Sequence, residues 1–122
     1  QTLANYDVEG KDPICNKAVT RPKEAGEIWI EGGNIVPLSS TVCTFMGIKK
    51  YEAAGKKIAV AYVYDKSLGL KVFADKAFYS VNGTAANLEV VPFLLKKDAE
   101  AYAAKAGATV ATYAQVLAKV EK

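Results

Sequence analysis

Three sulfur-containing side chains are the residues of this chain best suited to chemistry. Cys15 stands in the segment Asp12-Pro13-Ile14-Cys15-Asn16-Lys17, and Cys43 and Met46 lie three residues apart further along the chain. The sequence contains no histidine. Two thiols and one thioether are soft ligands, and soft sulfur ligands select monovalent copper. Metal chemistry here would therefore be sulfur chemistry, with Cys15, Cys43 and Met46 as candidate ligands of copper(I).

The two cysteines can also be interpreted as a disulfide. The chain starts at Gln1 and has its single methionine at Met46, which is typical of a protein whose export signal has been removed. We therefore expect it in the periplasm, outside the cell or at the cell surface, where thiols oxidise. A bridge between Cys15 and Cys43 would contribute about 3 kcal/mol to stability in the chain-entropy model. Because a disulfide consumes both thiolates, it excludes a copper site on the same sulfurs.

Cys43 and Met46 fall on a predicted helix, where a spacing of three places both side chains on one face. Together with Cys15 they would form a three-coordinate site of two thiolates and one thioether. In the alternative interpretation Cys43 is paired or buried as a free thiol, and Met46 belongs to the core face of this helix, which also carries Val42, Phe45 and Ile48.

Hydrophobic patterns and turn signals predict a chain of mixed strands and helices. Strands are expected at residues 27–31, 34–38, 57–64, 70–73, 78–82, 89–93 and 109–112, and helices at residues 39–52, 95–106 and 113–121. Gly32-Gly33 and Asn82-Gly83 are expected to form hairpin turns. Ser39 or Ser40 is expected to cap the first helix.

The order of these elements indicates a weak internal duplication. Val36-Pro37-Leu38-Ser39 leads into the first helix, and Val91-Pro92-Phe93-Leu94 leads into the second. A chain of 122 residues is long enough for one buried core. We expect one compact α+β domain of two related strand–strand–helix–strand halves, preceded by a polar arm. The predicted boundaries are residues 1–12 for the N-terminal arm, 13–122 for the domain, and about 13–65 and 66–122 for its halves.

Composition argues against three classes of protein. The chain has no histidine to act as a general base and no motif that pairs a nucleophile with a base, so we do not expect an enzyme. Its net charge is +3 and its lysines are scattered, so nucleic-acid binding is not expected. No apolar run approaches the length of about 18 residues that spans a bilayer, so no transmembrane segment is expected.

Several motifs taken together resemble the NosL family, exported accessory proteins of nitrous oxide reductase maturation. The matching stretches are Cys15 after Pro13, the hairpin from Glu27 to Leu38, the strand from Ile58 to Asp65, the segment from Ala74 to Tyr79, and Val91-Pro92-Phe93 before the helix that starts at Lys97. The resemblance extends from about residue 12 to residue 118. It implies a fold of two related α+β halves and delivery of copper(I) to a receiving protein.

The sequence departs from the family at three positions. The family signature near the start is Cys-x-Met, and this chain has Cys15-Asn16-Lys17. A second family methionine precedes the Pro-Phe strand, where this chain has Ala85-Ala86-Asn87-Leu88, and the lipid-anchoring cysteine of the family is replaced by Gln1. A cationic Lys17 next to Cys15 would repel an incoming copper ion, although it would favour the thiolate.

Two functions follow from these observations. In the first, the chain is a copper(I)-binding accessory protein that hands the ion to a partner. In the second, it is a structural or interaction module of NosL-like fold that has lost copper and contains a Cys15–Cys43 disulfide. In that case residues 1–12 would add a strand to a sheet edge of a further copy, and such pairing can continue into a filament.

Overall fold

A computed structural model describes residues 7–120 of the chain. The elements of this part are, in order, β1 (Lys11–Asp12), β2 (Lys17–Ala18), a 3-10 helix (Pro22–Glu24), β3 (Gly26–Ile30), β4 (Ile35–Leu38), α1 (Thr41–Ala53), β5 (Ile58–Tyr64), β6 (Lys71–Phe73), β7 (Phe78–Thr84), β8 (Asn87–Phe93), α2 (Lys96–Ala106), β9 (Thr109–Thr112) and α3 (Tyr113–Lys119). Within this part no helix is long and apolar enough to cross a membrane.

The two larger antiparallel sheets are built on the same plan. Their strand orders are β4-β3-β5-β6 and β8-β7-β9. In each, the first strand of a hairpin lies in the middle, between its hairpin partner and the strand that follows the helix. The prediction of an α+β domain with two related strand–strand–helix–strand halves is therefore confirmed. The first sheet has β6 as an additional edge strand, which pairs with β5 and has no counterpart in the second sheet.

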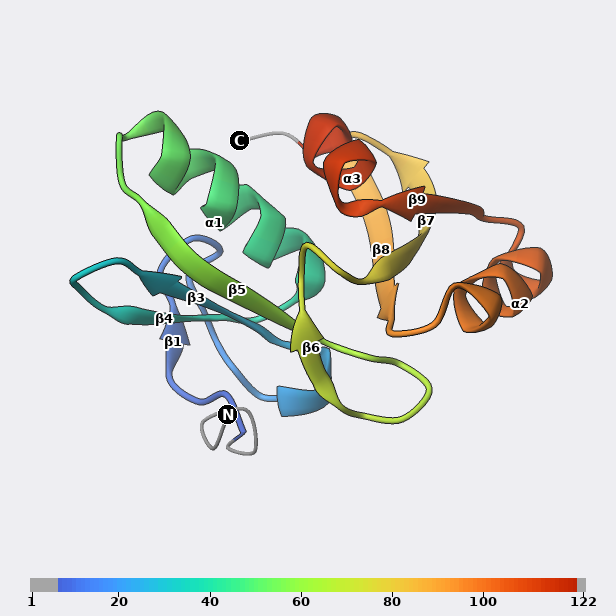
Figure 1. The fold of residues 1–122 in the computed structure, drawn as a ribbon, viewed down its shortest axis with the longest axis horizontal. Coiled ribbons are helices and arrows are strands. Elements are labelled where there is room, and N and C mark those ends of the chain that lie inside the picture. Colours follow the sequence, from blue (N-terminus) through green and yellow to red (C-terminus); the bar gives the residue numbers. More distant parts are fainter. Residues whose placement is uncertain (1–6, 121–122) are drawn as a thin grey trace.

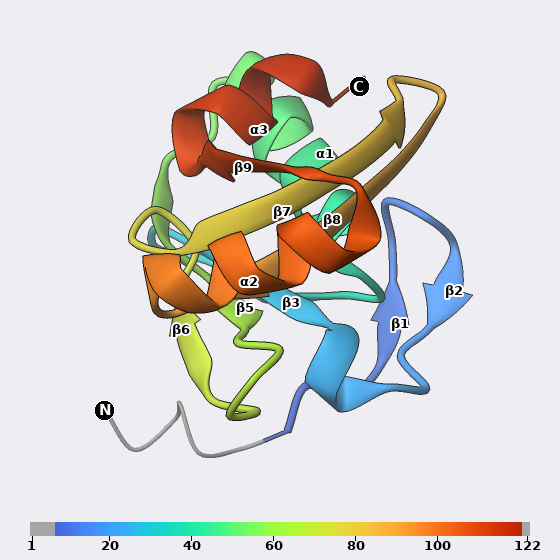
Figure 2. The same cartoon turned by 90° about the vertical axis from the view of Figure 1, so that its right-hand side faces the viewer.

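Helix α1 joins the two halves. It packs on β3 and β5 of the first sheet and also contacts β8 and α3 of the second half. Figure 1 shows α1 above the first sheet, with α2 and α3 on the other side of the molecule. Figure 2 shows α2 lying across β7 and β8. The core is accordingly divided into two large clusters that share α1.

The two clusters use different residues of α1. The first contains Ile48 and Cys43 of the helix, together with Ile28, Val36 and Leu38 of the first sheet. The second contains Phe45 of the helix and buried residues of both sheets, of the β6–β7 connection, and of α3 and its C-cap, which are Val63, Ala74, Ala77, Tyr79, Val81, Val90, Ala111, Val116 and Val120. Phe45 is wholly buried, and its ring meets the ring of Tyr79 edge-on at a centroid distance of 5.2 Å.

The prediction of a hairpin turn at Asn82-Gly83 is wrong. Both residues lie within β7, where Gly83 pairs with Leu88, and the connection to β8 is the two-residue turn at 85–86. Gly83 has a φ of +89°, which glycine adopts without steric cost. The Asn-Gly pair therefore continues the strand instead of reversing it.

Residues 7–12 pack on the domain. Val8 is 1% exposed and lies in a small cluster with Ala25 and Tyr64. Lys11–Asp12 forms β1, which pairs with β2 in a ribbon that the hydrophobic pattern did not predict. Of the predicted arm, residues 1–6 lie outside the described residues, and the remainder is part of the folded unit.

Candidate functional site

Cys15 and Cys43 form a disulfide. Their Cα atoms are 6.1 Å apart, so the prediction that the two cysteines are close in space is confirmed. Cys15 lies in the turn between β1 and β2 and is partly exposed, whereas Cys43 is 8% exposed. The sequence left a disulfide, a metal site and a free thiol open as alternatives. The structure contains the disulfide, and neither cysteine is free.

The start of α1 fixes the position of Cys43. Ser40 is the N-cap residue, as one of the two predicted serines, and its hydroxyl oxygen accepts a hydrogen bond from the Cys43 N–H at 3.1 Å. The hydroxyl of Thr44 donates to the Ser40 carbonyl oxygen at 2.8 Å. These capping bonds hold Cys43 in the first turn, where the helix presents its positive end.

A buried carboxylate organises the turn that carries Cys15. Asp12 has no exposed surface, and its Oδ1 accepts hydrogen bonds from the N–H groups of Ile14 at 2.7 Å and Cys15 at 2.9 Å. Its Oδ2 accepts from the N–H and the hydroxyl of Ser39, at 2.8 and 2.9 Å. Asn16 then adopts a left-handed φ of 57°, which returns the chain into β2. Asp12 thereby joins the Cys15 turn to the residue that precedes the helix cap.

Asp12, Cys15 and Cys43 together have the composition of a metal site, because one carboxylate oxygen and the two sulfurs lie within 4.8 Å of one another. An ionised carboxylate has about four acceptor positions. Four hydrogen bonds from protein donors already occupy those of Asp12. Asp12 therefore positions the turn, and the sulfurs are the atoms of this group suited to binding a metal.

Sequence reasoning did not assign a role to Asp12. The available signal was its place before Pro13, because an Asp at the start of a turn commonly accepts hydrogen bonds from backbone N–H groups two residues on. The bonds to Ser39 span 27 residues, and no local pattern predicts them. The negative charge of Asp12 also acts on Tyr51, whose pKa is raised first by burial and then by this carboxylate.

Met46 belongs to a different part of the core from the cysteine pair. It packs against the cluster of Phe45 and Tyr79, whereas Cys43 belongs to the cluster of Ile28 and its neighbours. Met46 thus packs in the core, as in the alternative interpretation of its role in the sequence. A third-ligand role for Met46 stays a prediction.

Comparison with solved structures bears on the fold. The structure is similar to the crystal structure of the copper chaperone NosL from Shewanella denitrificans, with a TM-score of 0.68 and 21% sequence identity, over 88% of this chain and 90% of that chain. The chain has the NosL fold. No protein-family model matches the sequence, and the comparison with curated proteins found no match. The resemblance deduced from the motifs is thus confirmed for the fold.

A second buried carboxylate, in the connection between β5 and β6, matches Asp12. Asp65 is 1% exposed, and its Oδ2 accepts the N–H of Leu68, three residues on, at 2.6 Å. Its Oδ1 accepts the N–H of Leu94 at 2.8 Å. Leu94 ends the Val-Pro-Phe junction as Ser39 ends the Val-Pro-Leu junction. Each of the two strand–helix junctions is therefore tied by a buried aspartate to a turn that precedes its hairpin.

The matching turns differ in their chemistry. Leu68 has the place in its turn that Cys15 has in the first, because each donates its N–H to the aspartate three residues before it. The residue after Leu68 is Gly69, with a φ of 72°, and the residue after Cys15 is Asn16, with a similar φ of 57°. The second turn therefore has the same construction and no thiol.

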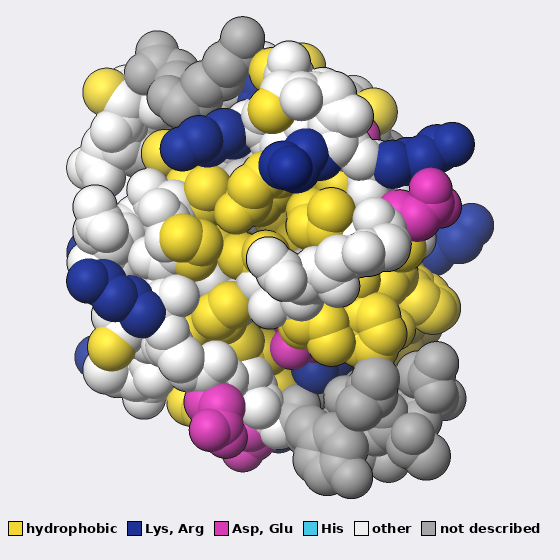
Figure 3. Space-filling view, turned by 90° about the vertical axis from the view of Figure 1, so that its left-hand side faces the viewer, with side chains coloured by type: hydrophobic (Ala, Val, Ile, Leu, Met, Phe, Trp, Pro, Cys, Tyr) yellow, Lys and Arg dark blue, Asp and Glu magenta, His cyan; other side chains and the backbone are white. Residues whose placement is uncertain are grey.

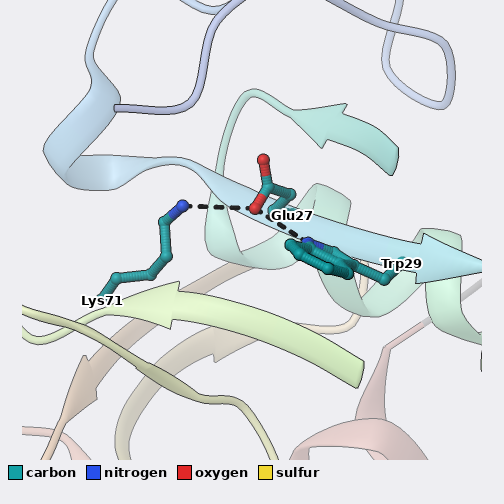
Figure 4. Close-up of polar contacts among 3 residues, drawn as sticks. All are labelled: Glu27, Trp29 and Lys71. Carbon is teal, nitrogen blue, oxygen red and sulfur yellow. Dashed lines mark hydrogen bonds and ion pairs between the residues drawn. The ribbon is translucent and has the colours of Figure 1, made fainter. Parts of the chain in front are cut away.

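A separate polar group lies on the outer face of the first sheet. Glu27 Oε1 forms an ion pair with Lys71 Nζ at 3.2 Å and accepts a hydrogen bond from Trp29 Nε1 at 3.0 Å (Figure 4). The Lys71 side chain is only 1% exposed, and its ammonium lies 5.5 Å from the centre of the Tyr62 ring. This group links β3 to β6, so its role is structural.

Aromatic rings continue across the same face of the sheet. Trp29 and Tyr62 meet edge-on with centroids 6.0 Å apart, and Tyr62 stacks on Phe73 at 5.4 Å. Phe73 is 49% exposed, and Ile35 on the edge strand β4 is 48% exposed. Figure 3 shows hydrophobic side chains gathered on the side where the β3–β4 and α1–β5 turns lie in Figure 1.

Proposed function

We propose that this chain is an exported, NosL-like accessory protein that binds copper(I) through Cys15 and Cys43 in their reduced state and hands the ion to a partner protein. The observation that carries the proposal is the meeting of both thiols at one point of a fold found in a copper chaperone. The protein would act by binding and transfer rather than by catalysis.

The surroundings of the two sulfurs support this role. Two thiolates are soft ligands that suit a monovalent copper ion. The positive end of α1 stabilises negative charge on Cys43, which lies in its first turn. Cys15 is partly exposed, so an ion held there is accessible to a receiving protein. Lys17 is exposed, so water solvates its charge and weakens its repulsion of the ion.

Copper(I) titration against a chromophoric chelator under anaerobic conditions tests the proposal. We expect the reduced protein to bind one copper(I) per chain and the oxidised protein to bind none, because the disulfide has no thiolate. Cys15→Ser is expected to weaken binding by roughly tenfold or more, and Met46→Leu less, because a neutral thioether contributes less than a thiolate. Equal affinity of the wild type and Cys15→Ser would contradict this function.

The alternative is a structural or interaction module of the same fold that has lost copper. The disulfide and the aromatic row of Trp29, Tyr62 and Phe73, of which Phe73 is 49% exposed, favour it. Because Asp12 is needed for the Cys15 turn, arm-mediated assembly is best tested by deleting residues 1–6 only. Large assemblies in light scattering that disappear with this deletion would support the module, and a monomer with and without these residues would contradict it.

A further inference from the structure

We infer that Asp12 keeps the Cys15 turn seated on α1 when the disulfide is reduced, so that the reduced chain presents a preorganised dithiol and the oxidation state of the pair controls copper(I) uptake. The control of uptake rests on the proposed function, to which it adds regulation. The positioning role of Asp12 stands on its own geometry.

The hydrogen bonds of Asp12 do not involve sulfur. Three of its four donors are backbone N–H groups, those of Ile14, Cys15 and Ser39, and the fourth is the Ser39 hydroxyl. Bonds to an ionised acceptor are stronger than those between neutral groups, and burial strengthens them further. Breaking the S–S bond leaves all four in place.

Apolar packing holds the same turn. Ile14 is half-buried against the first core cluster and reaches α1 at Gly47. A Cβ atom at Gly47 would lie 3.3 Å from Ile14 Cγ1 and 3.0 Å from Ile28 Cδ1. The missing side chain of Gly47 therefore provides the space in which Ile14 approaches the helix. This contact also persists without the disulfide.

The turn is closed at its base as well. Asp12 pairs with Lys17 and Lys11 with Ala18 across the β1–β2 ribbon, and the Val19 N–H donates to the Gly10 carbonyl oxygen at 2.8 Å. Cys43 is fixed by the cap of α1, and its Sγ lies 3.7 Å from the Ser39 hydroxyl, which is itself bonded to Asp12. Both sulfurs are therefore held by contacts other than the disulfide, and reduction removes only the bond between them.

Reduction and metal uptake then follow in sequence. A small dithiol reductant converts the protein disulfide to two thiols and is itself oxidised to a cyclic disulfide, so two electrons and two protons pass to the protein. Copper(I) then binds both sulfurs as thiolates and releases the two protons. The oxidised chain has no sulfur ligand to offer. Uptake is thus confined to the reduced state.

The positioning role of Asp12 has a measurable consequence without metal. Two thiols held close together have a high effective concentration, which favours the disulfide over the dithiol. Loosening the turn lowers this concentration. Asp12→Asn preserves the size of the side chain, but it removes the charge and turns one acceptor into a donor that faces backbone N–H groups. We expect this variant to be easier to reduce.

The experiment compares the full chain with Asp12→Asn and with Asp65→Asn in buffers of reduced and oxidised dithiothreitol. The dithiol fraction is measured by alkylation and mass spectrometry, and folding is checked by circular dichroism. We expect Asp12→Asn to shift the thiol–disulfide equilibrium toward the dithiol by about ten- to a hundredfold, as loss of hydrogen bonds to a charged group implies. Asp65→Asn is the matched control, because it removes the same kind of link where no cysteine is present.

Two results would overturn the inference. An unchanged equilibrium in folded Asp12→Asn would mean that the carboxylate does not position the pair. An equal shift in both variants would mean that general destabilisation is responsible. If Asp12→Asn does not fold, Ser39→Ala, which removes the hydroxyl bond to Asp12 together with the contact of that hydroxyl with Cys43 Sγ at 3.7 Å, is expected to give a smaller shift in the same direction, and no shift would count against the inference.

Failure of the copper proposal is distinguishable from failure of this one. The thiol–disulfide equilibrium is measured without metal, so a chain that binds no copper(I) still reveals whether Asp12 positions the pair. In the reduced state we expect Asp12→Asn to bind copper(I) more weakly than the wild type, because its two thiolates are less well placed for one ion. Equal affinity of the two reduced proteins would leave copper binding intact and contradict the role of the carboxylate.

Discussion

Replacing Cys15 and Cys43 together by alanine is expected to lower the free energy of unfolding by about 3–4 kcal/mol. The two residues are 28 positions apart, and closing a loop of that length restricts the unfolded chain strongly in the chain-entropy model. Domains of this size have a total stability of about 5–15 kcal/mol, so the expected loss is a large share of it. Urea unfolding followed by circular dichroism measures the difference.

Reductant provides the control for this prediction. Dithiothreitol is expected to lower the unfolding midpoint of the wild type and to leave that of the double-alanine variant unchanged. A loss below about 1 kcal/mol in the variant would contradict the chain-entropy account. It would mean that the contacts of Asp12 and Ile14 already restrict the turn in the unfolded ensemble as well.

Elements with a clear sequence signal were predicted closely. The strand expected at 57–64 is β5 at Ile58–Tyr64, because a run of β-branched and aromatic residues favours a buried strand. The helix expected at 95–106 is α2 at Lys96–Ala106, where alanines favour the helix and Gly107, with a φ of 68°, ends it. The Val-Pro junctions indicated the duplication of the halves because each directs a hairpin strand into a helix.

Elements held by distant contacts were not predicted. The β1–β2 ribbon has two residues in each strand, too few for any period to be read. Its stability depends on Asp12 reaching Ser39, 27 residues away, and on Ile14 reaching Gly47. Disulfide and copper ligation are both compatible with the sequence positions of Cys15 and Cys43, since both require the same two thiols close together. The sequence cannot distinguish the two, because the oxidised and the reduced chain have the same amino acids and differ only in the oxidation state of the two sulfurs.

Phe45→Ala is expected to lower the free energy of unfolding by about 3–5 kcal/mol, the usual cost of removing a buried phenylalanine ring. Phe45 has no exposed surface, and its ring contacts Tyr79 of β7 and Tyr113 of α3, with centroids at 5.2 and 5.4 Å. It is thus the fully buried residue of α1, on which Cys43 lies, in the contact with the second half, where Val42 and Met46 also pack. Phe73→Ala is the matched control, because Phe73 is 49% exposed and stacks on Tyr62, and we expect a loss of about 1 kcal/mol.

Hydrogen exchange shows which part of the fold loses stability in Phe45→Ala. The disulfide ties the Cys15 turn to α1 and does not reach the second sheet, so the cavity left by Phe45→Ala weakens the contact of α1 with β7 and α3 most directly. We expect the amides of the second sheet to lose more protection than those of β3 and β4, since regions with fewer remaining buried contacts open first. A uniform loss of protection would instead mean that the two halves unfold as one cooperative unit, and the duplicated plan of the sheets would then have no counterpart in how stability is distributed.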